Sequence, residues 1–227
     1  MTVAVVTGAG RGIGRATATA LARRGLDVAL LARTVEELEE AAASVRAEGR
    51  RALALRCDVT ESAELTRAAL DVTRELGAAS VVVANAGIVR RGLVHEMPES
   101  DWDDVLAVNL KGVFLTARAF LPQMLAEKRG RIIAIASISS TLGTARQSAY
   151  CAAKWGVVGL VKSLAEELRG TGLQAMSILP GSVETKMLEG SGYAPLMQPE
   201  DVANAVVYAA LDAPAAMNGS SIEMFGP

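Results

Sequence analysis

A tyrosine and a lysine four residues apart have the clearest potential for chemistry in this chain. Tyr150 and Lys154 would lie on one face of a helix, because positions i and i+4 are neighbours there. A free phenol has a pKa of about 10, and a nearby ammonium favours the phenolate and lowers that pKa. Ser137 follows the apolar run 131–136, so we expect its hydroxyl at the carboxyl end of a strand. This spacing predicts a site for proton transfer.

A glycine-rich turn near the amino terminus is the second group. The apolar run 3–6 precedes it and an alanine-rich stretch at 15–22 follows, which predicts a strand, a turn and a helix. Gly8 can form a tight turn, Gly12 lets the backbone approach a pyrophosphate, and Gly14 lets the helix pack closely. The N–H groups at the helix start would bind the phosphates, with a plain structural loop as the alternative. The expected cradle comprises Gly8, Gly10, Arg11, Gly12, Ile13 and Gly14.

Further motifs occur between and after these two groups. They are Asp58-Val59, Asn85-Ala86-Gly87, Asn109 and Pro180-Gly181-Ser182-Val183-Glu184-Thr185. With these pieces in this order, the chain resembles the short-chain dehydrogenases/reductases over nearly its whole length. The resemblance implies an oxidoreductase that uses a nicotinamide cofactor and interconverts a ketone and a secondary alcohol.

The resemblance also implies a role for each motif. Asp58 and the backbone of Val59 would border the adenine, and Asn85, Ala86 and Gly87 would flank the adenosine ribose. Pro180, Gly181 and Val183 would face the nicotinamide, with Thr185 near its amide or the phosphates. Tyr150 would donate a proton to the developing alkoxide, and Ser137 would polarise the carbonyl. Lys154 would lower the tyrosine pKa and hold the nicotinamide ribose, and Asn109 would link Lys154 to solvent through a water.

The choice of cofactor is predicted from charge. Members of the family that use NAD carry an acid at the end of the second strand. The corresponding residue here is Arg33, and Arg11 supplies a second cation in the glycine loop. Two guanidinium groups suit the 2′-phosphate of NADP, so NADPH is expected to be preferred over NADH. The alternative is that Arg33 is solvated and both cofactors bind.

The fold class is predicted to be α/β, with a single Rossmann-type doubly wound parallel sheet and helices on both faces. Apolar runs at 27–32, 51–56, 80–84, 131–136 and 174–179 alternate with helical stretches, and residues 221–224 would form the last strand. We expect residues 1–227 to form one domain. Thr34 to Glu37 has the pattern of a capping box. The helix after it would bury Val35, Leu38, Ala42 and Val45, and the next would bury Leu65, Ala69, Val72 and Leu76.

The segment after Thr185 is shorter than is usual in the family. Residues 186–198 replace the two short helices with which many relatives cover the substrate, and Pro199 then begins a helix. Two glycines in this segment predict a thin, mobile lid and an open site. Tight selectivity for a small substrate is therefore in doubt.

Composition excludes several classes of protein. The net charge of −2 gives no basic face for nucleic acid. No signal peptide is predicted, and no apolar stretch is expected to reach the roughly 18 residues that span a bilayer. The two cysteines fit no metal spacing, so no metal is expected and a reduced, cytoplasmic setting is the default. Cys151 as a nucleophile is the less favoured alternative to a small residue needed for packing, and the single His95 is predicted to lie in a surface loop.

The substrate and the assembly remain open from sequence. A 3-oxoacyl-carrier-protein reductase is favoured, with Lys128, Arg129, Arg131 and Arg169 docking an acidic carrier, although these residues also suit an ordinary solvated helix end. The alternatives are a broad reductase of free ketones or secondary alcohols and, more distantly, a regulator that senses NADPH without turnover. On the helix from about 148 to 169, Trp155, Val157, Leu160, Val161 and Leu164 offer more apolar surface than one sheet face needs, with an intramolecular core as the alternative. The resemblance implies that such a helix pairs two copies and that pairs often join through the last strand, so a homotetramer is expected, with a dimer as the fallback.

Overall fold

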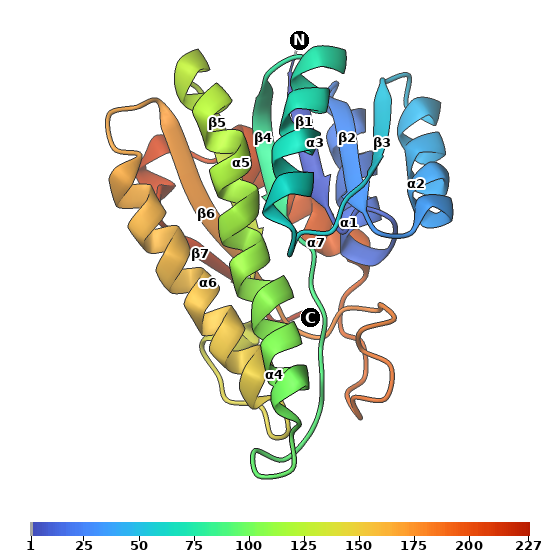
Figure 1. The fold of residues 1–227 in the computed structure, drawn as a ribbon, viewed down its shortest axis with the longest axis vertical. Coiled ribbons are helices and arrows are strands. Elements are labelled where there is room, and N and C mark those ends of the chain that lie inside the picture. Colours follow the sequence, from blue (N-terminus) through green and yellow to red (C-terminus); the bar gives the residue numbers. More distant parts are fainter. Residues whose placement is uncertain (1) are drawn as a thin grey trace.

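A seven-stranded parallel sheet forms the centre of the protein (Figure 1), which is described here from a computed structural model covering residues 2–227. The strands run in the order β3-β2-β1-β4-β5-β6-β7. Their bounds are β1 Val3–Thr7, β2 Asp27–Ala32, β3 Ala52–Arg56, β4 Ala79–Ala84, β5 Gly130–Ile135, β6 Leu173–Pro180 and β7 Ser221–Met224. Each strand begins and ends within one residue of the range predicted from the apolar runs, because central strands buried on both faces are almost continuously apolar.

Helices cover both faces of the sheet. Their bounds are α1 Gly12–Arg23, α2 Val35–Ala47, α3 Ser62–Glu75, α4 Glu99–Leu106, α5 Gly112–Glu127, α6 Ser148–Glu167 and α7 Pro199–Val207. Short π or 3-10 turns are η1 Ala107–Lys111, η2 Ile138–Ser140, η3 Tyr208–Asp212 and η4 Ala215–Met217. One buried cluster joins α3, α5 and α6 to the sheet, and the other joins α1, α2 and α7 to its opposite face. The doubly wound α/β prediction is therefore confirmed.

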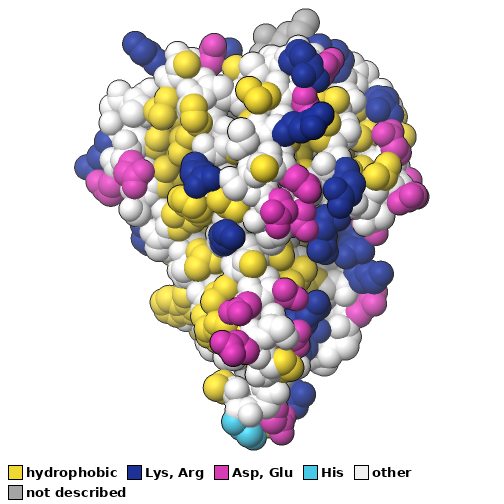
Figure 2. All heavy atoms as spheres, viewed as in Figure 1, with side chains coloured by type: hydrophobic (Ala, Val, Ile, Leu, Met, Phe, Trp, Pro, Cys, Tyr) yellow, Lys and Arg dark blue, Asp and Glu magenta, His cyan; other side chains and the backbone are white. Residues whose placement is uncertain are grey.

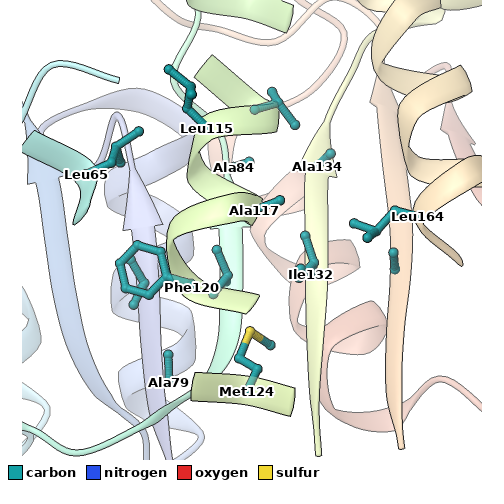
Figure 3. Packing of buried hydrophobic residues seen from close by; sticks show 14 of the residues in the cluster. Leu65, Ala79, Ala84, Leu115, Ala117, Phe120, Met124, Ile132, Ala134 and Leu164 are labelled. Carbon is teal, nitrogen blue, oxygen red and sulfur yellow. The ribbon is translucent and has the colours of Figure 1, made fainter. Parts of the chain in front are cut away.

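Helix α5 packs closely on the middle of the sheet (Figure 3). Phe120 and Met124 are fully buried, while small residues such as Ala117 on the helix and Ala134 on β5 let the two backbones approach. The continuous helical stretch from Glu99 to Glu127 is long and apolar enough to cross a membrane, so the expectation about apolar length is wrong. Its buried side chains lie in the core of the domain, which explains the apolar composition.

The start of α2 differs in detail from the sequence prediction. The helix begins at Val35 as expected, yet within residues 2–227 the Thr34 side chain makes no capping hydrogen bond. Val35 is exposed, whereas Leu38, Ala42 and Val45 are buried as predicted. The capping box lies instead at α7, where the Gln198 N–H donates to Asp201 at 2.8 Å.

Residues 186–198, called the lid segment below, connect β6 to α7. In the described chain this segment forms turns rather than helices. Val183 forms an isolated bridge with Met197, which closes the base of the segment. The short lid expected from sequence is therefore present, and it lies at the carboxyl end of the sheet together with the loops that follow β1, β4 and β5.

Candidate active site

Two loops meet where the strand order reverses between β1 and β4. The Thr7 hydroxyl accepts hydrogen bonds from the N–H groups of Asn85 at 3.0 Å and Ala86 at 3.1 Å. The Asn85 amide in return donates to the carbonyls of Thr7 at 2.9 Å and Gly8 at 3.2 Å. The glycine loop and the loop after β4 are thus held together at the topological switch point, where ligands bind in open α/β sheets.

Three glycines of the first loop are required by geometry. Gly8 has a φ of +63°, and a Cβ there would lie 2.8 Å from the Cα of Ala86. Gly12 also has a positive φ, and a Cβ there would lie 3.2 Å from the methyl group of Thr185. A side chain at Gly14 would overlap the carbonyl of Gly8. The loop therefore follows a path that only glycine can take, with Thr185 beside it.

The amino terminus of α1 offers free backbone donors. Arg11 is the extended N-cap residue, and among the described residues no side chain caps this helix and no acid lies in its first turn. Such a helix start is suited to a phosphate group. The Arg11 guanidinium pairs with Glu37 at 3.0 Å, and Ile13 packs on the core beneath.

The side chains expected around the adenosine also gather at this end of the sheet. Arg33 follows β2, is exposed, and lies 3.9 Å from the Asp58 carboxylate. Burial opposes ionisation of Asp58, but hydrogen bonds from Thr60 and the nearby arginines outweigh it, so the pKa of Asp58 is lowered. Val59 is buried against Gly112. The arrangement places two cations, Arg11 and Arg33, near the position expected for the ribose.

Asn109 lies in the π turn η1 between α4 and α5. Its amide donates to the carbonyls of Val105 at 2.8 Å and Ile88 at 2.9 Å, and its carbonyl accepts from the Ile88 N–H at 3.2 Å. A Cβ on Gly87 would lie 2.7 Å from Asn109 Oδ1 and 3.8 Å from Lys154 Nζ. Single π turns inside helices often mark functional sites, and this one brings Asn109 to Lys154.

Lys154 and Tyr150 occupy adjacent turns of α6, as the i, i+4 spacing predicts. The Lys154 ammonium is buried, donates to the Ile135 carbonyl at 2.7 Å and lies 5.5 Å from the centre of the Tyr150 ring. Ser137 follows β5 and caps η2 by accepting from the Ser139 N–H at 3.1 Å. Its hydroxyl also donates to the Pro180 carbonyl at 3.4 Å and forms a hydrogen bond with the Tyr150 phenol.

The pKa values correct one expectation. Lys154 was expected to lower the pKa of Tyr150, yet burial raises the pKa of Tyr150 to about 12. The Ser137 hydrogen bond and the positive charge of Arg91 offset only part of that increase. Burial also lowers the pKa of Lys154 to about 8, because the ammonium loses water. In this structure, desolvation is the largest influence on the pKa of both groups.

The remaining predicted residues lie on the neighbouring loops. Pro180 ends β6, and the Gly181 N–H donates to the Met224 carbonyl at 2.8 Å. Val183 is buried, and Thr185 begins the approach to the lid segment. Sequence reasoning did not identify the bridging role of Thr7, although its place directly before Gly8 was a usable signal. It also missed Arg91, which no motif or spacing indicates.

His95 and Cys57 lie apart from this cluster of reactive groups, whereas Cys151 directly follows Tyr150 on α6 and is half-buried. The His95 side chain is exposed in the loop before α4, as predicted. Cys57 is buried, and burial raises the pKa of its thiol to about 12. Such a thiol is almost fully protonated at neutral pH and is a poor nucleophile.

Comparison with known proteins agrees with this geometry. A family profile described as short chain dehydrogenase matches residues 2–194. A 3-oxoacyl-[acyl-carrier-protein] reductase FabG of Staphylococcus aureus is 36% identical, over 98% of this chain and 96% of the relative. A 2-(S)-hydroxypropyl-CoM dehydrogenase 3 of Xanthobacter autotrophicus is 33% identical, over 99% of this chain and 95% of the relative.

Solved structures give the same result. A short-chain type dehydrogenase/reductase from Mycobacterium marinum superimposes with a TM-score of 0.94 at 33% identity, covering 99% of this chain and 94% of that one. The profile, the curated relatives and the shared fold agree over almost the whole length. The chain is therefore an oxidoreductase that uses a nicotinamide cofactor, and it belongs to the short-chain dehydrogenase/reductase family.

Proposed function

We propose that this enzyme uses NADPH to reduce a ketone to a secondary alcohol, with Ser137, Tyr150, Lys154 and Asn109 as its proton relay. The supporting observation is the convergence of these side chains at the carboxyl end of the sheet, beside a helix start with free N–H groups. A bound nicotinamide supplies the hydride. Tyr150 donates its proton to the alkoxide, and Ser137 donates a hydrogen bond to the same oxygen.

Lys154 and Asn109 have supporting roles in this proposal. The buried ammonium stabilises the phenolate that remains after proton transfer, since opposite charges lie close together in a site of low polarity. Asn109 lies beside Lys154 at Gly87 and fixes the loop after β4 through Ile88. A water bound between Asn109 and Lys154 would return a proton to the site.

The preference for NADPH rests on Arg11 and Arg33. Both guanidinium groups are exposed at the end of the sheet where the adenosine ribose is expected. We expect Arg33→Asp to weaken NADPH binding by about 2 kcal/mol, because a charge-assisted phosphate contact is lost and repulsion is added. NADH binding should change far less.

The cofactor test has a matched control. Arg23 lies at the other end of α1, and its side chain is as exposed as that of Arg33, at 62% and 63%. Fluorescence titration of Arg33→Asp and Arg23→Asp with both cofactors would separate a local contact from a general change in charge. Equal losses for NADPH and NADH would contradict the 2′-phosphate assignment.

The favoured substrate is a 3-oxoacyl thioester on a carrier protein, with free ketones as the alternative. The structure corrects one residue of the proposed docking group. Arg131 donates to the carbonyls of Ala209 at 2.8 Å and Ala213 at 2.6 Å, so its guanidinium is occupied inside the protein. Lys128, Arg129 and Arg169 remain for an acidic partner, and the Arg169 guanidinium donates to Glu166 on the surface.

The distance along α6 limits how such docking works. Tyr150 and Arg169 are 19 residues apart, which is about 28 Å along a helix. A carrier bound at Arg169 therefore lies at the wrong end of α6 to serve this chain's own Tyr150. It could serve a second copy whose α6 runs in the opposite direction beside the first. The docking proposal thus depends on the assembly.

A substrate panel tests the proposed function. We expect NADPH oxidation to be faster with 3-oxoacyl groups on carrier protein than with the same groups on coenzyme A or with free ketones. Arg169→Glu should slow only the carrier-bound reaction. Faster turnover of free ketones would favour the broad reductase, and cofactor binding without turnover of any compound would favour an NADPH-sensing regulator.

Assembly is proposed from exposed apolar residues on α5 and α6. Val157, Val161 and Leu164 are buried in the core, so most of the surface expected from sequence is intramolecular. Phe114 and Trp155 are exposed at 44% and 54%, and hydrophobic side chains gather over α5 and α6 (Figure 2). A shallow cavity of about 470 Å³ lies there, lined mainly by Leu106, Leu110, Phe114 and Leu160.

We propose that this face pairs two copies and that the open edge of β7 joins two pairs into a homotetramer. Among the described strands β7 pairs only with β6, which leaves one edge for association. Light scattering at micromolar concentration should give four times the 23.6 kDa chain mass, with a dimer as the fallback. A monomer would contradict the assembly and, with it, the docking scheme. We also propose that the enzyme is cytoplasmic.

A further inference from the structure

Arg91 links two segments that border the reaction site. It lies in the loop between β4 and α4, four residues after Gly87. Its guanidinium donates to the lid carbonyls of Met187 at 2.9 Å and Glu189 at 3.4 Å. The two contacts come from different nitrogen atoms, so the planar group holds the lid backbone as a fork.

The lid that Arg91 holds reaches the catalytic side chains. Met187 is the lid residue whose carbonyl accepts the shorter of the two hydrogen bonds. A Cβ on Gly87 would lie 3.7 Å from the Met187 methyl carbon and 3.8 Å from Lys154 Nζ. Fixing the Met187 backbone therefore also fixes an apolar group beside the lysine. Two turns within the lid, Leu188 N–H to Thr185 and Ser191 N–H to Leu188, depend on the same stretch of backbone.

Arg91 also acts on the Tyr150 phenol. Ser137 after β5 is the polar neighbour of the phenol, and the Lys154 ammonium on α6 lies 5.5 Å from the centre of its ring. The positive charge of Arg91 favours the phenolate and opposes the effect of burial. The Nε atom of Arg91 is buried and has no hydrogen-bond partner among the described residues. This N–H is therefore free to donate a hydrogen bond to a further group.

We propose that Arg91 is a positioning residue, which fastens the lid segment over the catalytic side chains. This role follows from the contacts of Arg91 with Met187 and Glu189, so it does not depend on the proposed function of Tyr150. One side chain thus links the loop after β4 to the lid that borders the reaction site.

Three variants test this role. Arg91→Ala removes the fork and the charge, whereas Arg91→Lys keeps the charge and loses the fork. Arg90→Ala is the matched control, because Arg90 is the exposed neighbour and pairs only with Asp101 at 3.4 Å among the contacts described. All three are compared with the unmodified enzyme by hydrogen exchange and by steady-state kinetics with NADPH and a ketone.

Hydrogen exchange reports the lid without any turnover. We expect the amides of Leu188 and Ser191 to exchange at least tenfold faster in Arg91→Ala and Arg91→Lys, and unchanged in Arg90→Ala. KM for the ketone should rise about tenfold in both Arg91 variants, the scale of one lost hydrogen bond to a charged group. Unchanged exchange in Arg91→Ala would overturn the proposed latch.

The proposed function is tested separately. Failure of Tyr150→Phe to lose activity would contradict the proposed function, and would leave the exchange result for the Arg91 variants standing.

Discussion

Buried charge is handled differently at the two ends of the sheet. At the amino end, the carboxylate of Asp27 is 2% exposed and is bound by Arg50 at 2.7 Å and by Arg51 at 2.8 Å. At the carboxyl end, Lys154 is equally buried, yet its ammonium is hydrogen-bonded to the Ile135 carbonyl and to no carboxylate in residues 2–227. Both ends thus contain a buried ion, and only one of the ions is neutralised.

The pKa values express this difference. Burial alone would raise the pKa of Asp27, but the hydrogen bonds and charges of the two arginines lower it, so the carboxylate is held ionised. The pKa of Lys154 is lowered to about 8 because burial meets no compensating anion. Removing one partner of a buried, paired charge is destabilising, whereas an unpaired buried charge is itself costly and is retained where it is needed for chemistry. Three substitutions test this contrast.

The largest effect is expected on turnover at the carboxyl end. Tyr150→Phe should reduce kcat by a hundredfold or more, because the acid that donates the proton is removed, and should leave cofactor affinity nearly unchanged. Tyr208→Phe is the matched control, since its hydroxyl only contacts the sulfur of Met217 at 3.5 Å. Ordinary turnover of a ketone by Tyr150→Phe would show that another group donates the proton.

The next effect is expected on stability at the amino end. Asp27→Ala should lower the free energy of unfolding by about 2 kcal/mol, because two partly exposed arginines lose their shared buried anion. The turnover number should be unchanged. Urea unfolding measures the loss, with Glu166→Ala as the control, since its pair with Arg169 is exposed and worth little. Equal losses of unfolding free energy in the two variants would mean that the buried Asp27 pairs stabilise the protein no more than an exposed ion pair does.

The sequence predicted the fold and the cradle well because their signals are local. Uninterrupted apolar runs indicated each strand to within one residue, and glycines at positions 8, 12 and 14 are needed where the chain turns or packs closely. Spacing on a single helix was sufficient to place Tyr150 near Lys154. These features depend on residues that are close together in the sequence, so the sequence alone is enough to predict them.

Features that depend on distant contacts could not be predicted. The pKa of Tyr150 depends on burial by several elements, and the sequence argument included only the nearby lysine. Arg131 looked like a surface cation beside Lys128, yet it binds carbonyls about 80 residues further along the chain. Arg91 meets the lid in the same way, across more than 90 residues. Long arginine side chains are the least predictable part because they reach whichever backbone folding brings close.

The smallest change in stability is expected when the unpaired ion itself is removed. Lys154→Met should abolish most turnover, yet raise the free energy of unfolding at pH 7 by about 1 kcal/mol, because an apolar side chain of similar length avoids the cost of burying a cation. Lys162→Met is the control, since Lys162 is exposed and only reaches the Gly219 carbonyl at 3.5 Å. No gain in stability is expected there.

The pH dependence of the stability gained in Lys154→Met tests whether the cost of burying a cation is its cause. Between about pH 8 and the ordinary lysine pKa of 10.5, the unfolded chain binds a proton that the folded chain has released, so stability rises with pH in this window. Methionine removes this contribution, and the other titrating groups are common to both proteins. The advantage of Lys154→Met should therefore be largest below pH 8 and shrink towards pH 10. A constant difference, or a loss of stability at pH 7, would show that the Ile135 hydrogen bond compensates for the missing anion.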